Sequence, residues 1–413
     1  MLPERFISSL TDQLGRDAAE RFLAAAERDP SVSVRLNPFK RPSPEVPVPE
    51  GAPVAWSPYG RILAERPVFT LDPLLHAGAY YVQDSSAMFA GWVFRQSLGA
   101  VATEPGRPLR VLDLCAAPGG KSTDLAASLR ERFGDGFQLV ANEVMRNRAA
   151  ILSDNVAVWG DPAVSVTAVD PKAFASLEGW FDLILADVPC SGEGMFRKDA
   201  KAVGDWSEQT VSLCAARQKR ILSDVWPALR EGGMLVYSTC TFSREENDDN
   251  VTWMESVLDA ELQLPEQAFE GILRTEKGFL LLPGFVPGEG QYVSAVRKRS
   301  GPASSRKPAS ALQILHPLRS GVTEGTWRGR DFVPDPDWAL SLSCVRGRWP
   351  EWEADRRTAL RFLHRDTVTL PDAPNGYVLL TYGGLPLGFV KNIGTRCNNL
   401  HPQRRRILMD IGI

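Results

Sequence analysis

The sequence lacks paired cysteines and cysteine–histidine clusters. Among 413 residues there are six cysteines and four histidines. The cysteines are Cys115, Cys190, Cys214, Cys240, Cys344 and Cys397. None of them forms a C-x-x-C pair, and only Cys397 has a histidine nearby, His401. This pattern disfavours a zinc site and, in a long chain, a disulfide framework. We therefore expect no metal, and we interpret Cys214 and Cys344 as small buried apolar residues.

Long apolar runs and an excess of one charge are also lacking. The N-terminus, Met-Leu-Pro-Glu-Arg, has no charged-then-apolar leader, and dense apolar segments such as 279–282 are far too short to cross a bilayer. A formal net charge of -3 gives no global sign of nucleic-acid binding, so any basic surface must be local. We expect a cytoplasmic protein of two or three domains, with no membrane contact.

Residues 1–104 read as a helical and mixed region. Phe6, Leu10 and Leu14 recur at helical spacing, and residues 33–39 indicate a strand broken by Pro38. Six prolines between positions 42 and 58 predict an irregular connector. Gln83, Asp84 and Ser85 precede a helical pattern, so they either cap that helix or belong to an active site.

From about 105 to 299 the pattern alternates between strands and helices. Strands are predicted at 110–114, 138–142, 165–169, 182–186 and 234–238, with the longest helix at 207–230 stopped by two glycines. Such alternation is typical of parallel βαβ units in a doubly wound α/β sheet. The apolar runs 279–282 and 291–296 predict a hairpin that adds an antiparallel edge strand.

The remainder reads as a linker and a small domain. Residues 297–307 carry five basic side chains and no acid, which predicts a basic, mobile tether within a linker placed at 300–330. Residues 331–413 hold a predicted helix at 350–365, a hairpin of 377–381 with 387–391, and three arginines at 404–406. This domain is compatible with RNA binding or with simple packing against the core.

Polar residues follow successive strands, where open α/β sheets bind their ligands. The loop Asp113-Leu-Cys-Ala-Ala-Pro-Gly-Gly-Lys-Ser122 joins a strand to a helix, either as a cofactor cradle or as an ordinary tight turn. Glu143 suits the hydroxyls of a ribose and Asp170 an adenine amino group, although either acid alone is more often a helix cap or an ion-pair partner. The loop is neither G-x-G-x-x-G nor a P-loop. An adenosine with an amino-acid arm is therefore favoured over a phosphate, and S-adenosylmethionine fits.

Two cysteines stand at the ends of neighbouring predicted strands, in Asp187-Val-Pro-Cys-Ser-Gly192 and Ser238-Thr-Cys-Thr241. A thiolate that adds to carbon 6 of a pyrimidine makes carbon 5 nucleophilic, and a second group must then remove the proton from carbon 5. Asp187 could hydrogen-bond the ring nitrogen of the base. The alternative is two buried cysteines without a catalytic use. Ser243 and Glu246 have the spacing of a capping box, which predicts a helix that starts just after Cys240 and lowers the pKa of its thiol.

Three motifs carry a family resemblance. DLCAAPGGKST, DVPCSGEGMFRK and YSTCTFSREEN resemble the motifs of the NOL1/NOP2/Sun RNA cytosine-5 methyltransferases. SVRLNPFK and HAGAYYVQDSSAM are similar to the N-terminal RNA-facing segment of that family. The tail GYVLLTYGGLPLGFVKNIGTRCNNLHP resembles the PUA-like domain of its bacterial RsmF-type (YebU-like) branch. The resemblance implies a Rossmann-like, seven-stranded S-adenosylmethionine-dependent methyltransferase fold flanked by two RNA-binding parts.

The resemblance also implies roles for single residues. Cys240 would be the nucleophile and Cys190 would assist release of the product, while Asp187 faces the methionine arm and the target base. Glu143 would bind the ribose and Asp170 the adenine. The cofactor loop would consist of Cys115, Ala116, Ala117, Pro118, Gly119, Gly120 and Lys121.

The implied substrate is a cytidine in ribosomal RNA, most readily of the small subunit, bound by a monomer. A tRNA cytosine-5 methyltransferase and a ribosome-assembly factor with little catalysis remain alternatives. A DNA cytosine-5 methyltransferase, which would use Cys190 as its nucleophile, is disfavoured by the Thr-Cys motif and the PUA-like tail. Local basic clusters that include Arg197, Lys198 and Lys201 predict salt-sensitive RNA binding.

Overall fold

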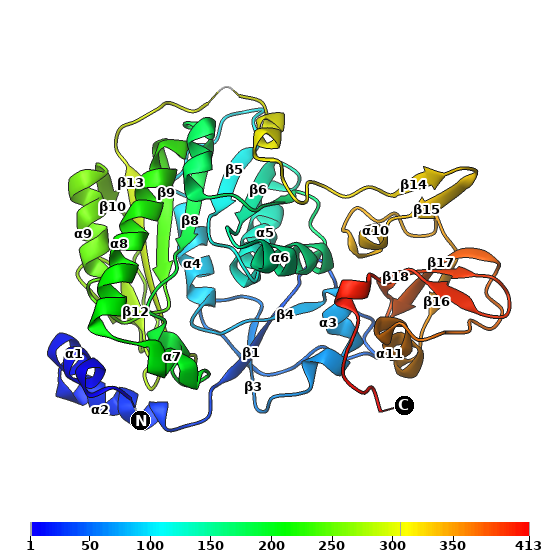
Figure 1. The fold of residues 1–413 in the computed structure, drawn as a ribbon, viewed down its shortest axis with the longest axis horizontal. Coiled ribbons are helices and arrows are strands. Elements are labelled where there is room, and N and C mark those ends of the chain that lie inside the picture. The colour runs from blue at the N-terminus through cyan, green and yellow to red at the C-terminus, as the bar shows by residue number, and fades with distance from the viewer. Residues whose placement is uncertain (1, 306, 413) are drawn as a thin grey trace.

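A computed structural model describes residues 2–305 and 307–412. Arg306, one of the five basic residues of the predicted tether, lies outside the described residues. Figure 1 shows a large α/β unit with a smaller C-terminal unit beside it, and helices α1 and α2 at its N-terminal end. None of the described helices is long and apolar enough to cross a membrane. The described residues contain no group of three or more His, Cys, Asp or Glu side chains that could hold a metal ion.

A mixed sheet forms the centre of the large unit, in the order β11-β12-β13-β9-β8-β5-β6-β7, with β10 also paired to β13. Its strands are β5 (Leu109–Asp113), β6 (Phe137–Asn142), β7 (Val164–Thr167), β8 (Phe181–Asp187), β9 (Leu229–Thr239), β10 (Ala260–Leu262), β11 (Leu273–Arg274), β12 (Phe279–Leu281) and β13 (Gln291–Lys298). β7, β6, β5, β8 and β9 are parallel, and β13 is antiparallel to β9. The α/β class and the predicted hairpin are confirmed. Among the described residues the sheet has nine strands where seven were expected, because the short β10 and β11 add to its edge.

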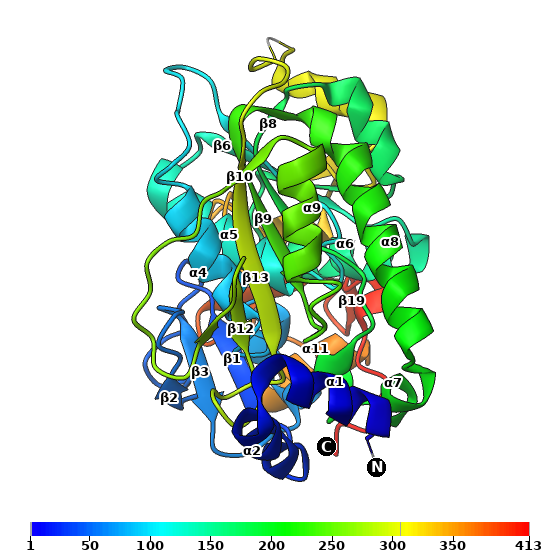
Figure 2. The same ribbon diagram turned by 90° about the vertical axis from the view of Figure 1, so that its left-hand side faces the viewer.

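Helices cover both faces of this sheet, as Figure 2 shows from the side. They are α4 (Met88–Ser97), α5 (Gly120–Phe133), α6 (Arg146–Trp159), α7 (Ala200–Asp205), α8 (Glu208–Val225), α9 (Asp248–Val257) and the 3-10 helices η2 (Pro171–Leu177), η3 (Glu193–Met195) and η4 (Trp226–Ala228). Neighbours along a strand point to opposite faces. Val111 therefore packs in the cluster that contains α4 and α5, whereas Leu112 packs in the one that contains α8. Both faces of the parallel strands are buried, which accounts for their continuous apolar runs.

The predicted end of the longest helix is wrong. α8 ends at Val225, η4 follows, and β9 begins at Leu229, so the two glycines at 232 and 233 lie inside a strand. The pairing of β8 with β9 shifts register between Phe181 and Leu183, opposite this segment, and Gly232 has a φ of +68°. The glycines thus form an irregularity in the strand, a second common use of glycine that the sequence does not distinguish from a helix stop.

The N-terminal region contains two parts. The helical spacing of Phe6, Leu10 and Leu14 is confirmed by α1 (Glu4–Leu14). A second helix, α2 (Arg16–Ala26), follows, and the two helices pack Phe6 and Phe22 into the core of the large unit. The second part is a sheet in the order β2-β3-β1-β4. Its elements are β1 (Val32–Leu36), β2 (Ala52–Pro53), β3 (Gly60–Leu63), η1 (Phe69–Leu71), α3 (Pro73–Ala77) and β4 (Tyr80–Val82).

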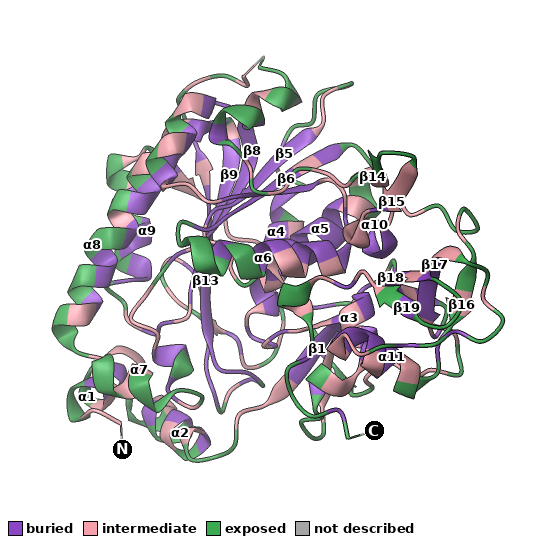
Figure 3. Cartoon of the chain, turned by 45° about the vertical axis from the view of Figure 1, so that its right-hand side comes forward, coloured by how far each residue is buried: buried purple, intermediate pink, exposed green. Residues whose placement is uncertain are grey.

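The C-terminal unit is built on a sheet in the order β16-β17-β18-β19. Its elements are η5 (Ala309–Leu315), β14 (Gly325–Arg328), β15 (Asp331–Pro334), α10 (Pro336–Leu340), β16 (Glu351–Glu353), α11 (Arg356–His364), β17 (Gly376–Tyr382), β18 (Leu385–Asn392), β19 (Cys397–Asn399) and η6 (Gln403–Arg405). The hairpin of β17 and β18 is confirmed, while the predicted helix at 350–365 divides into β16 and α11. One apolar cluster joins this unit to the N-terminal sheet, with Val34 and Leu74 packed among residues of α11 and β17. Figure 3 shows the buried residues between α3 and α11.

The described part of the predicted tether is held against the large unit. The Arg110 guanidinium donates to the carbonyl oxygens of Ser305 at 3.4 Å and Lys307 at 2.6 Å. The Lys307 ammonium donates to the Ser176 carbonyl oxygen at 2.6 Å. Lys298, at the end of β13, is buried and donates to backbone carbonyls of Trp226 and Leu229. The expectation of a free basic tether is therefore wrong for these residues.

Candidate active site

The two loops that follow β8 and β9 bring Cys190 and Cys240 together. Their Sγ atoms lie 3.2 Å apart. β8 and β9 are parallel neighbours, with Asp187 paired to Ser238, so both loops leave the sheet at the same edge. Across the loops the Gly194 N–H donates to the Cys240 carbonyl oxygen at 2.8 Å, and the hydroxyl oxygens of Ser191 and Thr241 are 2.8 Å apart. These contacts hold the two thiols at one point.

The environment of the two thiols differs. The hydrogen bond between Cys190 and Cys240, together with burial, raises the pKa of Cys190 well above its ordinary value. The Cys190 thiol therefore holds its proton more strongly than a free cysteine does, and its sulfur lies within hydrogen-bond distance of the Cys240 sulfur. Two sulfur atoms at this distance suit one cysteine that attacks and a second that assists it.

Glu246 connects the two loops, and the predicted capping box is wrong. α9 begins at Asp248 with Asn247 at its N-cap, eight residues after Cys240, so the helix does not start just after the thiol. Glu246 Oε2 instead accepts hydrogen bonds from the Ser191 N–H at 3.0 Å and from Gln218 Nε2 at 2.7 Å. Burial raises the pKa of Glu246 to about 7. Ser243 and Glu246 thus have the spacing of a capping box, but the Glu246 carboxylate binds the backbone of the loop that contains Cys190.

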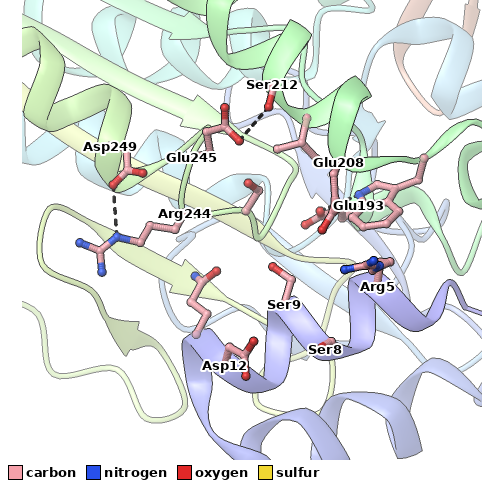
Figure 4. A pocket seen from close by; sticks show the side chains of 14 residues that line it. Arg5, Ser8, Ser9, Asp12, Glu193, Glu208, Ser212, Arg244, Glu245 and Asp249 are labelled. Atoms are coloured by element: carbon pink, nitrogen blue, oxygen red, sulfur yellow. Dashed lines mark hydrogen bonds and ion pairs between the residues drawn. The ribbon is translucent and has the colours of Figure 1, made fainter.

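Glu193 adds a second link, which sequence reasoning missed although this residue lies inside a quoted motif. Its carboxylate accepts from the Phe242 N–H at 2.7 Å and from Trp206 Nε1 at 2.9 Å, which ties the β8 loop to the residues after Cys240. Beyond it lies a cavity of about 670 Å³ between α1 and this loop. Figure 4 shows its walls, where Glu193 faces Arg5 of α1 and where Arg244 and Glu245 turn outward to Asp249 and Ser212. These contacts hold the exposed side chains of Arg244 and Glu245 at the surface.

Asp187 lies beside the thiols at the end of β8. Its carboxylate oxygens accept hydrogen bonds from Lys121 Nζ at 2.9 Å, Ser238 Oγ at 2.8 Å and Gln291 Nε2 at 3.1 Å. Burial acts to lower the pKa of Lys121, but the adjacent Asp187 outweighs it and the pKa is raised, so the ammonium remains charged. Gln291, at the start of β13, carried no signal in the sequence.

The glycine loop follows β5 and leads into α5. Gly119, at the N-cap of α5, has a φ of +116°, and a Cβ there would lie 3.2 Å from Leu152 of α6. The Ala116 N–H donates to the Asn142 carbonyl, and the Ala117 and Pro118 carbonyls accept from Arg148 at 3.0 Å and Asn155 at 2.7 Å. The loop is thus held against α6 by its carbonyl groups.

Burial raises the pKa of a carboxyl and of a thiol near this loop. Asp113 is fully buried; its Oδ2 accepts from Ser122 Oγ at 2.6 Å, while Oδ1 has no hydrogen-bond partner among the described residues. Burial raises the pKa of Asp113 to about 7. Desolvation also raises the pKa of the Cys115 thiol, which is consistent with a structural role for this cysteine.

Glu143 and Asp170 stand at the ends of β6 and β7. Glu143 is buried; its Oε1 accepts from the Met145 N–H at 2.9 Å and its Oε2 lies 3.2 Å from Arg148 Nη1. Asp170 is more open. It caps η2 by accepting from the Lys172 N–H at 3.2 Å, and it lies 3.8 Å from Arg220. The capping and ion-pair interpretations therefore both apply to Asp170.

The N-terminal sheet contacts the glycine loop through Arg35. This guanidinium has no solvent exposure and donates to the Gly120 carbonyl at 3.0 Å, to Thr123 Oγ1 at 2.5 Å and to Gln83 Oε1 at 2.8 Å. Of the two alternatives for residues 83–85, a side-chain cap on α4 is not observed, since the N-cap of α4 is Ala87, without a side-chain cap. Asp84 instead accepts from the Ser86 and Glu289 N–H groups.

Two of the three basic residues predicted to bind RNA near Cys190 form ion pairs with acidic side chains. Arg197 lies 3.3 Å from Glu289 and donates to the Asp29 carbonyl, and Lys198 lies 3.2 Å from Asp84. Lys201 is exposed. In the C-terminal tail Arg404 pairs with Asp154 at 2.7 Å, and Arg405 contacts Asp337. Much of the predicted basic surface therefore holds the molecule together.

Comparison with known proteins covers nearly the whole chain. Family models described as the N-terminal domain of 16S rRNA methyltransferase RsmF, 16S rRNA methyltransferase RsmB/F and the methyltransferase RsmF PUA domain match residues 2–85, 100–297 and 350–407. The chain is 35% identical to ribosomal RNA small subunit methyltransferase F of Cronobacter sakazakii and 34% identical to that of Escherichia coli O157:H7. Each alignment covers 97% of this chain and 96% of the relative.

Solved structures share the fold. A methyltransferase homolog protein from Pyrococcus horikoshii, 25% identical, superposes with a TM-score of 0.58 over 72% of this chain and 100% of its own. NSun6 from Pyrococcus horikoshii, solved with SFG, is 18% identical, and it superposes with a TM-score of 0.58 over 72% of this chain and 98% of its own.

Proposed function

The chain belongs to the ribosomal RNA small subunit methyltransferase F family, and from this premise we propose that it methylates carbon 5 of a cytidine in 16S rRNA. The methyl donor in this proposal is S-adenosylmethionine. The observation that carries the proposal is the pair of thiols, Cys190 and Cys240, 3.2 Å apart at the carboxyl edge of a methyltransferase sheet. A methyltransferase that acts on an exocyclic amine or a ribose oxygen needs no such pair.

In the proposed reaction the Cys240 thiol gives its proton to solvent and its thiolate forms a bond to carbon 6 of the cytosine, while the electron pair of the carbon 5–carbon 6 double bond moves to carbon 5. The cofactor supplies an electrophilic methyl group, which carbon 5 takes up. A base then removes the proton on carbon 5, the double bond re-forms, and the Cys240 sulfur leaves. The Cys190 sulfur lies 3.2 Å from that sulfur, and we propose that its thiol assists release by stabilising the departing thiolate through a hydrogen bond. The target base must leave its stack to reach the thiols.

The residues at the strand ends fit the proposed cofactor. Glu143 is a buried acid at the end of β6, suited to the ribose hydroxyls, and Asp170 at the end of β7 is suited to the adenine amino group. The loop formed by residues 115–121 would face the amino-acid arm, with Lys121 and Asp187 at its catalytic end. The buried Asp113 oxygen without a partner supports a polar or cationic group nearby.

We extend the proposal to the whole chain. Residues 1–104 and 331–413 bind RNA, residues 105–299 carry catalysis, residues 300–330 join them, and the protein acts as a cytoplasmic monomer on rRNA or the small subunit.

The test uses wild-type protein with Cys240→Ala, Cys190→Ala and, as a matched control, Cys214→Ala, whose buried cysteine lies on α8 and is not part of the thiol pair. Each protein is incubated with protein-free 16S rRNA or with 30S subunits and radiolabelled S-adenosylmethionine, and the nucleosides are analysed by mass spectrometry. We expect 5-methylcytidine from wild type and Cys214→Ala, a loss of at least about a thousandfold for Cys240→Ala, and a covalent RNA adduct with Cys190→Ala.

Three outcomes would contradict the proposal. Activity in Cys240→Ala would refute the assigned nucleophile, and another methylated nucleoside would refute carbon 5. A wild-type protein that binds subunits but transfers no methyl group would favour the assembly-factor alternative.

A further inference from the structure

A cavity of about 430 Å³ lies where the N-terminal sheet, the methyltransferase sheet unit and the C-terminal unit meet. β4 and α3 form one wall, the exposed side of α6 a second, and the C-terminal tail a third. Its lining includes Tyr81, Ile151, Trp159, Leu340, His401 and Arg405. Cavities of about 300–1,000 Å³ are typical of sites for small ligands or single groups of larger ones. None of these residues takes part in the methyl transfer proposed above.

Two walls of the cavity are aromatic and aliphatic. The Tyr81 ring is half-buried on β4, and Ile151 on α6 faces it from an exposed position, with 53% of its surface accessible. Such walls suit the flat face of an unstacked base, because every base has an apolar π-face.

The third wall carries buried polar groups without partners. The Arg405 side chain is only 7% exposed, yet its Nε and Nη1 atoms have no hydrogen-bond partner among the described residues. His401 is 5% exposed, and its Nε2 is likewise without a partner there. Burial lowers the pKa of His401 to about 3, so the ring is neutral and offers one donor and one acceptor. Arg405 Nε also lies 4.0 Å from Asp154 Oδ1, beyond hydrogen-bond distance. Buried polar atoms without partners are uncommon in folded proteins, and here they belong to two residues that line a cavity.

The charge at the rim is also suited to an anion. Arg404, 59% exposed, stands at the mouth and lies 2.7 Å from Asp154 of α6. Asp337 is shared by Arg405 and Arg319. Around the tail three guanidinium groups thus face two carboxylates, which leaves positive charge for a phosphate.

We propose that this cavity binds one unpaired, non-reacting nucleotide of the rRNA substrate, with its base against Tyr81 and Ile151 and a polar edge or phosphate on Arg405 and His401. The proposal rests on the proposed RNA substrate. A peptide is the weaker candidate, because the three walls come from the three segments that match rRNA methyltransferase domains.

The cavity is coupled to the cofactor loop by one side chain. Asn155, on the α6 wall, donates to the Pro118 carbonyl at 2.7 Å and lies 3.3 Å from the Tyr81 hydroxyl. A nucleotide in the cavity would therefore lie against the back of the loop, and its site would set how the RNA strand approaches the thiols.

The experiment compares two cavity variants with two matched controls. Ile151→Glu introduces a negative charge at the mouth, and Arg404→Ala removes the rim cation. Leu213→Glu introduces the same charge at a similarly exposed apolar site on α8, and Arg299→Ala removes an exposed, ion-paired arginine that follows β13. Full-length proteins are titrated with a fluorescent single-stranded fragment of 16S rRNA and with 30S subunits, and methyl transfer is measured in parallel.

We expect both cavity variants to weaken RNA binding at least about fivefold, the loss expected when one stacked base or phosphate contact is removed. KM for RNA should rise by a similar factor while kcat stays within about twofold, and both controls should match wild type. Equal RNA affinity in all five proteins would overturn the proposal. Loss of 30S binding with unchanged affinity for naked RNA would overturn it too, since a protein partner would then occupy the cavity.

Failure of the proposed function is distinguishable from failure of this inference. If wild type forms no 5-methylcytidine but the cavity variants still lose RNA affinity, the nucleotide site stands and the reaction assignment falls. If methyl transfer occurs and the affinities are unchanged, the reaction stands and the site falls.

Discussion

At the scale of single residues, burial sets the charge of several groups around the glycine loop. Asp113 is enclosed at the end of β5 with one oxygen unpaired, and Glu246 is enclosed between two loops; burial raises the pKa of each carboxyl to about 7. The hydrogen bond with Cys240 and burial raise the pKa of Cys190 well above its ordinary value. Burial therefore favours the neutral form of each of these three groups.

The first residue-scale prediction concerns the pH dependence of stability. The pKa of Asp113 is raised from 3.8 to about 7, so the folded state holds a proton that the unfolded state has lost between these values. Its stabilising effect is thus present at low pH and lost as the pH rises toward 7. Asp113→Asn removes this dependence. We expect its free energy of unfolding, relative to wild type, to increase by about 3 kcal/mol between pH 5 and pH 8.

Urea denaturation at the two pH values, followed by tryptophan fluorescence, measures the effect. Asp12→Asn, at an exposed acid on α1, serves as the control and should follow the wild-type pH dependence. Parallel curves for Asp113→Asn and wild type would show that Asp113 is ionised in the folded protein.

At the scale of elements, the site depends on how closely two loops approach. The loop after β8 crosses the one after β9 at Gly194, where a Cβ would lie 2.9 Å from the Cys240 carbonyl oxygen and 3.1 Å from that of Glu289. Both are backbone atoms, so neither can swing aside. The φ of Gly194 does not lie in the positive range, so backbone conformation does not require glycine here. The close approach of the two carbonyl oxygens does, because it leaves no room for a Cβ.

We therefore predict that Gly194→Ala displaces Cys240 and lowers methyl transfer by at least about tenfold, because small displacements of a nucleophile are costly. Gly204→Ala is the matched control, since a Cβ there meets no atom within 4 Å and α7 gains a better helix former. Its activity should equal that of wild type. Circular dichroism checks the folding of both variants, and single-turnover methylation measures their activity. A fully active Gly194→Ala would show that the two loops can accept a Cβ without displacing Cys240.

At the scale of the whole molecule, the C-terminal unit is docked rather than tethered. α10 packs on α6, the Leu342 N–H donates to the Gly160 carbonyl at 2.9 Å, and Arg404 reaches Asp154. Gly160 ends α6 with a φ of +90°, and a Cβ there would lie 2.1 Å from the Leu340 carbonyl oxygen. The junction that encloses the proposed nucleotide cavity thus depends on this glycine.

Gly160→Ala should separate the C-terminal unit from α6. We expect calorimetry to show two unfolding transitions in place of one, together with weaker RNA binding. Gly106→Ala is the control: its φ of +77° carries the same backbone strain, of about 1–2 kcal/mol, but a Cβ there meets nothing. A single transition in Gly160→Ala, at the temperature found for Gly106→Ala, would contradict the proposed docking.

Much of the fold could be predicted because its signals are local. Between 105 and 299, each strand–helix–strand unit by itself indicates that its two strands are parallel. In the C-terminal unit, the Gly383–Gly384 turn indicates the hairpin of β17 and β18. Boundaries failed where one residue type serves two purposes. The glycines at 232 and 233 fit a helix stop as well as a strand irregularity, and Ser243 with Glu246 fits a capping box as well as a clamp between loops.

The sequence by itself determined the α/β class, the family resemblance and the residue types at the strand ends, because these depend on periodicity and on contiguous motifs. Only the tertiary structure decided that Cys190 and Cys240 meet and that Gln291 and Glu193 hold the loops around them. It also decided that Lys298 and Lys307 of the tether, and Arg404 and Arg405 of the tail, contact the rest of the protein. The physical reason is separation along the chain. Contacts between residues 50 to 250 positions apart depend on how strands and domains pack, and no local pattern carries that information.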